Sequence, residues 1–318
     1  MIHVYPTRAD WLAAREDRIG ASEVYYLLNA PAVFLQRRAT PMEDNDDLWR
    51  GRQMEPIVGA FYTRQTGNEA LHPGVFHGGG PASLVVETHD TYPWAAASPD
   101  FYVGTVGGVE AKTQRSRREW SDDDVAILEV GDLAEGTAPA HMLTQVYWTL
   151  AVTGRDWWDL VALLPSYELR TVRIHADPDF QAELLERATD ARDRYIIRGE
   201  LPPIDGTSDC AALLARRFPV EGKAVRQATR AEVALLDRFA SAQAEAEAAK
   251  YRAATLRNQV LSCIGADYGI QGGGRRAVAP TMQRESFRLS EVPADVRRLL
   301  EERGLIRQGR ESRQVRLS

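Results

Sequence analysis

The chain has 318 residues, of which 44% are hydrophobic and 26% are charged, and its formal net charge is −6. This composition is ordinary for a folded globular protein and argues against a disordered chain. No apolar run approaches the roughly 20 residues that span a bilayer, and the N-terminus lacks a secretory signal pattern, so we expect a cytoplasmic protein with no membrane partner. Cys210 and Cys263 lie far apart, so neither a disulfide framework nor an iron–sulfur cluster is indicated.

Residues 11–30 predict two short helices separated at Arg18, Ile19 and Gly20. Ser22 lies near the start of the second helix. A serine there can satisfy free backbone N–H groups, and a helix N-terminus also attracts phosphate. Capping alone would explain Ser22, and the two roles are compatible.

Residues 31–48 contain two prolines and an acidic run, so we expect an exposed loop. A helix follows, with apolar residues at helical spacing, and it ends at Gly67. The expected buried positions are Met54, Ile57, Val58 and Phe61. Glu55 lies beside this stripe and is either a surface residue paired with Arg52 or part of a site.

Residues 83–89 predict the first core strand. Asp90 follows it, either as a turn residue or as an additional carboxylate near a site. The spacing of His72, His77 and His89 does not fit a zinc site.

Residues 95–114, AAASPDFYVGTVGGVEAKTQ, predict a β-hairpin, because two short apolar runs flank the turn residues Gly104, Gly107 and Gly108. This places Asp100 on one strand and the segment 110–112 on the other. Side chains alternate between the faces of a strand, so Glu110 and Lys112 project from the same side.

If Asp100 lies on the neighbouring strand, its carboxylate joins that of Glu110 around a divalent cation, and Mg²⁺ prefers such oxygen ligands. Lys112 would then point at a metal-bound water or at a scissile phosphate. The arrangement favours metal-assisted phosphodiester hydrolysis. Acidic and basic residues also alternate on the solvated face of many strands, which is the alternative interpretation.

A basic segment directly follows this hairpin. Arg115, Arg117, Arg118 and Trp120 would line the path of DNA, or they form a solvated loop neutralised by the aspartates after them. With a net charge of −6, any DNA contact must rely on such a local basic surface.

Residues 139–153 predict a helix that begins near Pro139 and ends at Gly154. Its expected buried stripe is Met142, Val146, Thr149 and Leu150. Gln145 lies one position from the stripe, where a buried amide needs partners. Two strands and a further helix follow, and Gly199 and the prolines at 202 and 203 mark a boundary.

We therefore expect two domains, 1–204 and 205–318. The second is predicted to be mainly helical, with a long helix or coiled coil over residues 227–263 and a basic tail. Gly272, Gly273 and Gly274 lack the pattern of a phosphate-binding loop and predict a flexible turn.

The segments SPDFYV and GGVEAKT closely resemble the core of the PD-(D/E)xK nuclease superfamily, in particular its YqaJ-like viral recombinase and phage lambda-type exonuclease branch. WLAAREDRIGASEV, GRQMEP and the helix ending in VTG resemble further motifs of this branch. The resemblance covers roughly residues 10–200. It departs from the branch at Met142, where a tyrosine is common.

The resemblance implies an α+β fold with a central mixed sheet flanked by helices. It implies that Asp100, Glu110 and the Ala111 carbonyl ligate the metal, with Glu55 contributing through water. It further implies that Lys112 and Gln145 act on the attacking water, and that Arg15, Ser22 and Ser98 hold a terminal 5′-phosphate.

The expected activity is that of a Mg²⁺-dependent deoxyribonuclease, with Mn²⁺ able to substitute. It would resect the 5′ strand of linear duplex DNA in phage-type recombination. The resemblance also implies a ring-shaped homotrimer and a single-strand annealing protein as partner. The alternatives are an endonuclease or Cas4-like nuclease of the same fold, and an inactive protein that binds DNA ends or a partner.

Overall fold

The computed structural model describes residues 1–40, 45–80, 83–114, 127–128, 138–219, 225–280 and 292–303. The chain divides into two compact units, Met1–Leu213 and Leu214–Ser318. Among the described helices, none combines the length and the hydrophobicity needed to cross a lipid bilayer.

Two sheets form the framework of the first unit. The larger has the strand order β5-β6-β8-β9-β7 and the smaller the order β1-β3-β4-β2. The larger sheet contains β5 (Phe101–Val103), β6 (Gly107–Thr113), β7 (Ile127–Leu128), β8 (Trp157–Leu163) and β9 (Leu169–His175). The smaller contains β1 (Ile2–Tyr5), β2 (Ile19–Gly20), β3 (Leu84–Thr88) and β4 (Ala95–Ala97). Both combine parallel and antiparallel pairs, as expected for a mixed sheet.

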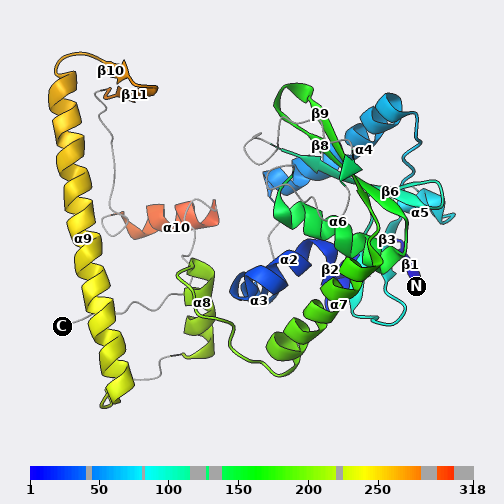
Figure 1. Cartoon of the computed structure of the whole chain (residues 1–318), viewed down its shortest axis with the longest axis horizontal. Coiled ribbons are helices and arrows are strands. Elements are labelled where there is room, and N and C mark those ends of the chain that lie inside the picture. The colour runs from blue at the N-terminus through cyan, green and yellow to red at the C-terminus, as the bar shows by residue number, and fades with distance from the viewer. Residues whose placement is uncertain are drawn as a thin grey trace. The chain divides into compact units, whose positions relative to one another are not determined.

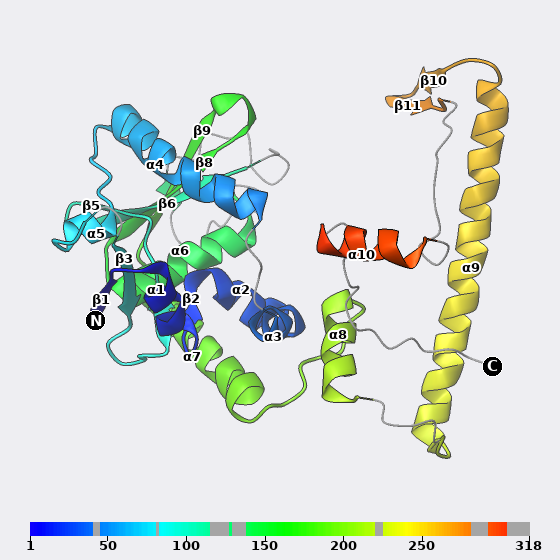
Figure 2. The same ribbon diagram turned by 180° about the vertical axis from the view of Figure 1, so that it is seen from behind.

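Helices flank the larger sheet on both faces (Figures 1 and 2). The helices are α1 (Arg8–Arg15), α2 (Ala21–Asn29), α3 (Pro31–Ala39), α4 (Asp46–Thr66), α5 (Pro73–Phe76), α6 (Ala140–Thr153) and α7 (Pro178–Arg192), which continues as a π-helical turn over Asp193–Ile197. A 3-10 turn, Pro165–Tyr167, joins β8 to β9. Alternate residues of β8 face different helices, since Val161 packs with Val58 of α4 and Leu160 belongs to the core around α6. The expected α+β architecture is thus confirmed.

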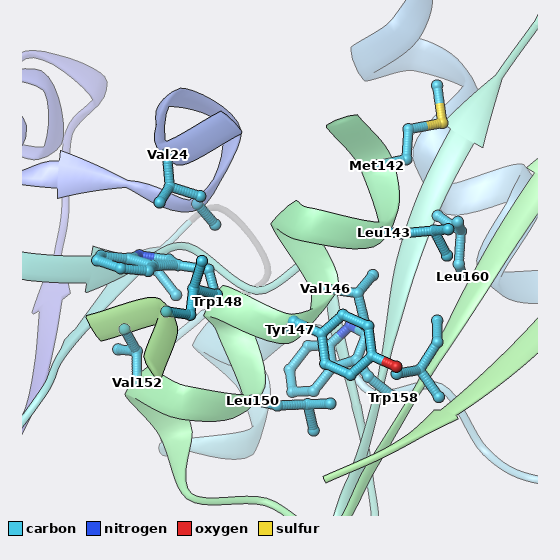
Figure 3. Packing of buried hydrophobic residues seen from close by; sticks show 14 of the residues in the cluster. Val24, Met142, Leu143, Val146, Tyr147, Trp148, Leu150, Val152, Trp158 and Leu160 are labelled. Carbon is cyan, nitrogen blue, oxygen red and sulfur yellow. The ribbon is translucent and has the colours of Figure 1, made fainter. Parts of the chain in front are cut away.

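Helix α6 is the centre of the larger hydrophobic core, and the four positions predicted for its buried stripe are all buried. Figure 3 shows Leu143 beside Leu160 of β8, while Trp148 extends toward Val24 of α2. The Trp148 indole N–H also donates to the Ala96 carbonyl, 3.0 Å away. The helix therefore joins the larger sheet to the smaller one.

The prediction that Gly107 and Gly108 lie in a turn is wrong. Both begin β6, and in the parallel register with β8 they lie beside Trp157 and Trp158. A Cβ atom at Gly108 would stand 2.5 Å from the Trp158 ring, so only glycine lets the strand and the indole approach this closely. The turn itself contains Gly104, whose φ of +55° lies in the left-handed region.

Three further expectations need correction. Much of the stretch expected as a loop, 31–48, is helical, because α3 occupies Pro31–Ala39 and α4 begins at Asp46. Strand β3 is not the first, since β1 precedes it and pairs with it antiparallel. In α4, Ile57 and Phe61 are each 41% exposed, while Met54, Val58 and Tyr62 face the sheet. The true stripe follows steps of four residues.

A buried aspartate connects α4 to the larger sheet. Asp159 of β8 is 1% exposed, and its carboxylate accepts a hydrogen bond from the Tyr62 hydroxyl at 2.7 Å. Arg173 of β9 donates two further hydrogen bonds to it, each 2.8 Å long. The carboxylate is thereby paired and fully hydrogen-bonded, which is the condition under which a buried charge is tolerated.

The second unit is mainly helical in its described part, as predicted. Its elements are the long helix α9 (Arg230–Ile264), the hairpin β10 (Gly269–Gly272) and β11 (Arg275–Val278), and α10 (Ala294–Glu302). Helix α8 (Ser208–Arg217) spans the division between the units. Gly273 and Gly274 form the hairpin turn with positive φ, which confirms the predicted turn. The hairpin around it was not predicted.

We expect Asp159→Asn to destabilise the protein by about 3 kcal/mol, because it leaves Arg173 without its counter-charge next to a buried amide. Tyr62→Phe is the matched control that removes a single hydrogen bond, and we expect a loss of about 1 kcal/mol. Urea unfolding followed by circular dichroism gives both values. Equal losses for the two variants would contradict the assigned importance of the Asp159–Arg173 pair.

Candidate active site

The pairing of β5 with β6 sets the geometry of the candidate site. Phe101 pairs with Val109, so Asp100, one residue before β5, lies opposite Glu110. The Asp100 carboxylate accepts a hydrogen bond from the Ala111 backbone N–H at 2.8 Å. Side chains directly opposite each other on antiparallel strands are near neighbours, so the two carboxylates share one face of the hairpin.

Glu110 is the most buried member of this group, with 2% exposure. Its Oε1 atom accepts a hydrogen bond from the Gln145 side-chain amide of α6 at 2.6 Å. The same oxygen accepts a hydrogen bond from the Lys112 ammonium group, two residues along the strand. Side chains from β6 and α6 thus converge on one carboxylate oxygen.

The ionisation of the site reflects this crowding. Burial raises the pKa of Asp100 well above its usual value, and the charge of Glu110 raises it further. For Lys112, burial alone would lower the pKa, but the charges of Glu110 and Asp100 outweigh it and raise the pKa. Lys112 is therefore a cation at neutral pH and acts as a counter-ion between the two carboxylates.

Glu55 of α4 belongs to the same electrostatic group. Burial raises the pKa of Glu55, the charge of Lys112 lowers it and that of Glu110 raises it, while Arg52 has a weaker effect. If Glu55 were a surface residue paired with Arg52 alone, Arg52 would have the largest charge effect on its pKa. Lys112 and Glu110 have larger effects. The structure thus places Glu55 beside the hairpin site.

The chemistry of these residues fits a hard divalent cation. Three carboxyl groups, Asp100, Glu110 and Glu55, act on one another there, and Lys112 supplies a single positive charge among them. In the described part of the chain, no three or more acidic, histidine or cysteine side chains form a ready-made metal cage. Mg²⁺ does not require one, because it is usually held by one or two carboxylates and keeps several waters.

Arg15, at the end of α1, lies beside the start of α2. Its guanidinium group stands 4.3 Å from the centre of the Trp11 ring, and a Cβ atom at Gly20 would be 2.8 Å from it. Burial lowers the pKa of Arg15, which the charge of Glu23 partly offsets. Glu23 also pairs with Arg38 at 3.4 Å, so this carboxylate interacts with two arginines.

The interpretation of Ser22 as a helix cap is wrong. Helix α2 begins at Ala21, and its N-cap is Gly20, whose backbone N–H donates to the Glu23 carboxylate at 2.8 Å. Ser22 lies in the first turn and is exposed. Its hydroxyl is therefore not assigned to capping.

Ser98 lies at the same end of the smaller sheet as Ser22. Strands β2 and β4 are parallel, with Gly20 paired to Ala96, and each serine follows two residues after this pair. The Ser98 hydroxyl is buried and has no hydrogen-bond partner among the described residues. A buried hydroxyl without a hydrogen-bond partner is uncommon in a folded protein.

The other predicted residues have different outcomes. Arg115, Arg117, Arg118 and Trp120 lie outside the described residues. Asp90 is exposed and pairs with the N-terminal amine at 2.9 Å. The sequence did not predict a zinc site at His72, His77 and His89.

Two of those histidines accept hydrogen bonds from nearby backbone N–H groups through Nδ1. His72 accepts from Gly74, and His89 accepts from Thr91 and Tyr92.

The sequence analysis did not predict the ion pair between Glu23 and Arg38. The only signal available was the spacing of Glu23 three residues after Gly20, which is typical of a capping box.

Comparison with known proteins finds one family whose model matches part of the chain. Residues 10–156 match the model of the YqaJ-like viral recombinase domain. No curated protein matches the chain significantly. Every residue proposed above for the metal and phosphate sites lies within the matched segment.

Solved structures that this chain matches include LHK-Exo, an alkaline exonuclease from Laribacter hongkongensis. It is 23% identical and has a TM-score of 0.44, with 60% of this chain and 97% of that chain covered. A structure of LHK-Exo in complex with dAMP covers 57% of this chain and 90% of that chain, with the same identity and TM-score. A phage-related exonuclease from Haemophilus somnus 129PT is 12% identical, with a TM-score of 0.39, and 55% of this chain and 92% of that chain are covered. Over residues 10–156, the N-terminal unit of this chain is similar to the YqaJ-like viral recombinase domain.

Proposed function

We propose that the unit Met1–Leu213 is a metal-dependent deoxyribonuclease that degrades linear duplex DNA from its ends. The observation that carries this proposal is the convergence of two carboxylates, Asp100 and Glu110, with Lys112 on one face of the β5–β6 hairpin. The family of residues 10–156 supports a role in phage-type recombination. A purely solvated hairpin face would not bury Glu110 to 2% exposure.

Asp100, Glu110 and the Ala111 carbonyl would hold Mg²⁺, or Mn²⁺ in its place, with Glu55 contributing through water. When bound, the ion would supply a nucleophilic water of lowered pKa and neutralise charge on the phosphate. Lys112 is held at Glu110, from where its ammonium group can orient the attacking water. Gln145 fixes the Glu110 carboxylate by its 2.6 Å hydrogen bond.

The second part of the proposal is that the enzyme binds a 5′-phosphate at the end of the strand. Arg15 lies beside the N-terminus of α2, and both attract an anion. Ser22 and Ser98 follow the paired strands β2 and β4 at the same end. Ser98 is two residues from Asp100, so a phosphate held here would fix the position of the next phosphodiester bond relative to the carboxylates. The expected polarity is therefore 5′→3′.

We expect Lys112→Ala to lower the rate of DNA hydrolysis with Mg²⁺ by about a hundredfold or more, because the variant lacks the group that acts on the attacking water. The assay compares linear duplex with covalently closed circular duplex. The wild type should degrade the linear form, spare the circle, and lose activity when EDTA removes the metal.

Asp90→Asn is the matched control, because it removes a carboxylate that is exposed and pairs with the N-terminal amine. Its activity should equal that of the wild type. Cutting of the circle would indicate an endonuclease. Binding of linear DNA without any hydrolysis would indicate an inactive DNA-end-binding protein.

We expect Arg15→Gln to abolish the preference for 5′-phosphorylated over 5′-hydroxyl ends, a loss of about tenfold or more in relative rate, because a charge-assisted contact is removed. The measurement is the degradation rate of two duplexes that differ only in the 5′-phosphate. Arg187→Gln, which removes an exposed arginine of α7 paired with Glu183, should leave the preference intact. An unchanged preference in Arg15→Gln would place the phosphate elsewhere.

A further inference from the structure

Helix α9 carries an apolar seam that the rest of the described chain leaves largely exposed. Its positions recur in alternating steps of four and three residues, the heptad spacing of coiled coils. They are Leu235, Phe239, Ala242, Ala246, Ala249, Ala253, Leu256, Val260 and Cys263. Leu235 is 60% exposed and Leu256 62%. The helix runs without a break over 35 residues (Figures 1 and 2), so it can present the seam continuously.

The order of side-chain sizes along this seam is nearly the same in both directions. Large residues lie toward both ends, and four alanines lie between them. When a second α9 is placed antiparallel and centred on the alanines, Leu235 faces Val260 of the second copy and Phe239 faces Leu256. The alanines then face alanines. Such a pair has two-fold symmetry, and both copies use the same surface.

The charges beside the seam favour the antiparallel direction. In an antiparallel pair, Glu245 lies next to Arg252 of the second copy, and symmetry produces this attraction twice. In a parallel pair, Glu245 would lie next to Lys250 of the second copy, and this attraction is offset by the repulsion between Arg252 and Arg257 of the second copy. The sequence therefore distinguishes between the two directions, although either one would bury the apolar residues.

Helix α10 of the same chain is too short to cover the seam. It has nine residues, and at about 1.5 Å per residue it extends about 13 Å. The seam from residue 235 to residue 263 extends about 42 Å on the same scale. A helix of equal length is required, and a second α9 has that length.

We propose that α9 is a self-association site, at which a second copy of this chain binds antiparallel through the seam. The proposal does not depend on the nuclease activity, because α9 belongs to the second unit and contains none of the candidate site residues.

The first test measures the molar mass of the full chain in solution by light scattering. We expect the double variant Ala246→Glu/Ala249→Glu to have half the mass of the wild type, because it places charge in the centre of the seam. Ala244→Glu/Ala248→Glu adds the same charge outside the seam and should keep the wild-type mass. Equal masses for all three proteins would overturn the proposal.

The second test determines the direction by disulfide formation in a Cys263→Ser background. One protein carries Leu235→Cys and the other Val260→Cys, and they are mixed and oxidised. An antiparallel pair should cross-link the two different proteins to each other. Cross-linking of each protein only to itself indicates a parallel pair, and no cross-linking indicates that the seam does not bind a second copy. Either result overturns the proposal.

Discussion

The first unit holds two carboxylates, Asp100 and Glu110, next to each other and largely out of water. Burial and the charge of Glu110 both raise the pKa of Asp100. Three kinds of contact offset this cost: the Ala111 N–H on Asp100, the Gln145 amide on Glu110, and the Lys112 ammonium group. Strand β6 supplies the Ala111 N–H and Lys112, and helix α6 supplies Gln145, so the packing of β5, β6 and α6 brings these contacts together as a frame.

That frame depends on close approach between strands. Gly107 and Gly108 let β6 lie against Trp157 and Trp158, and this parallel pairing continues along the strand to Glu110 and Lys112. The glycines therefore serve packing rather than turn formation. On the opposite face, the buried Asp159 network attaches α4, which carries Glu55 toward the site.

Local sequence patterns predicted much of the secondary structure of this unit, because those elements are determined by residues close together in the sequence. The hairpin, the alternation of Glu110 and Lys112, and the buried stripe of α6 all follow from periodicity and from the residues at element ends. The errors occurred where tertiary contacts decide. Nothing local shows that Gly108 faces an indole 50 residues later, that Asp159 meets Tyr62 of a distant helix, or that Ile57 and Phe61 point away from the sheet. The partners of Glu23 and Arg38 could not be read from spacing either.

Helix α6 has a consequence for how the two ends of the site relate. The Gln145 side-chain amide donates a hydrogen bond to the Glu110 carboxylate. About one turn further along the same helix, the Trp148 indole N–H donates to the carbonyl of Ala96, which lies two residues before Ser98. A helix turn behaves as a rigid body over so short a span. A tilt or slide of α6 that keeps both hydrogen bonds displaces the amide at the carboxylates and the backbone leading to Ser98 together.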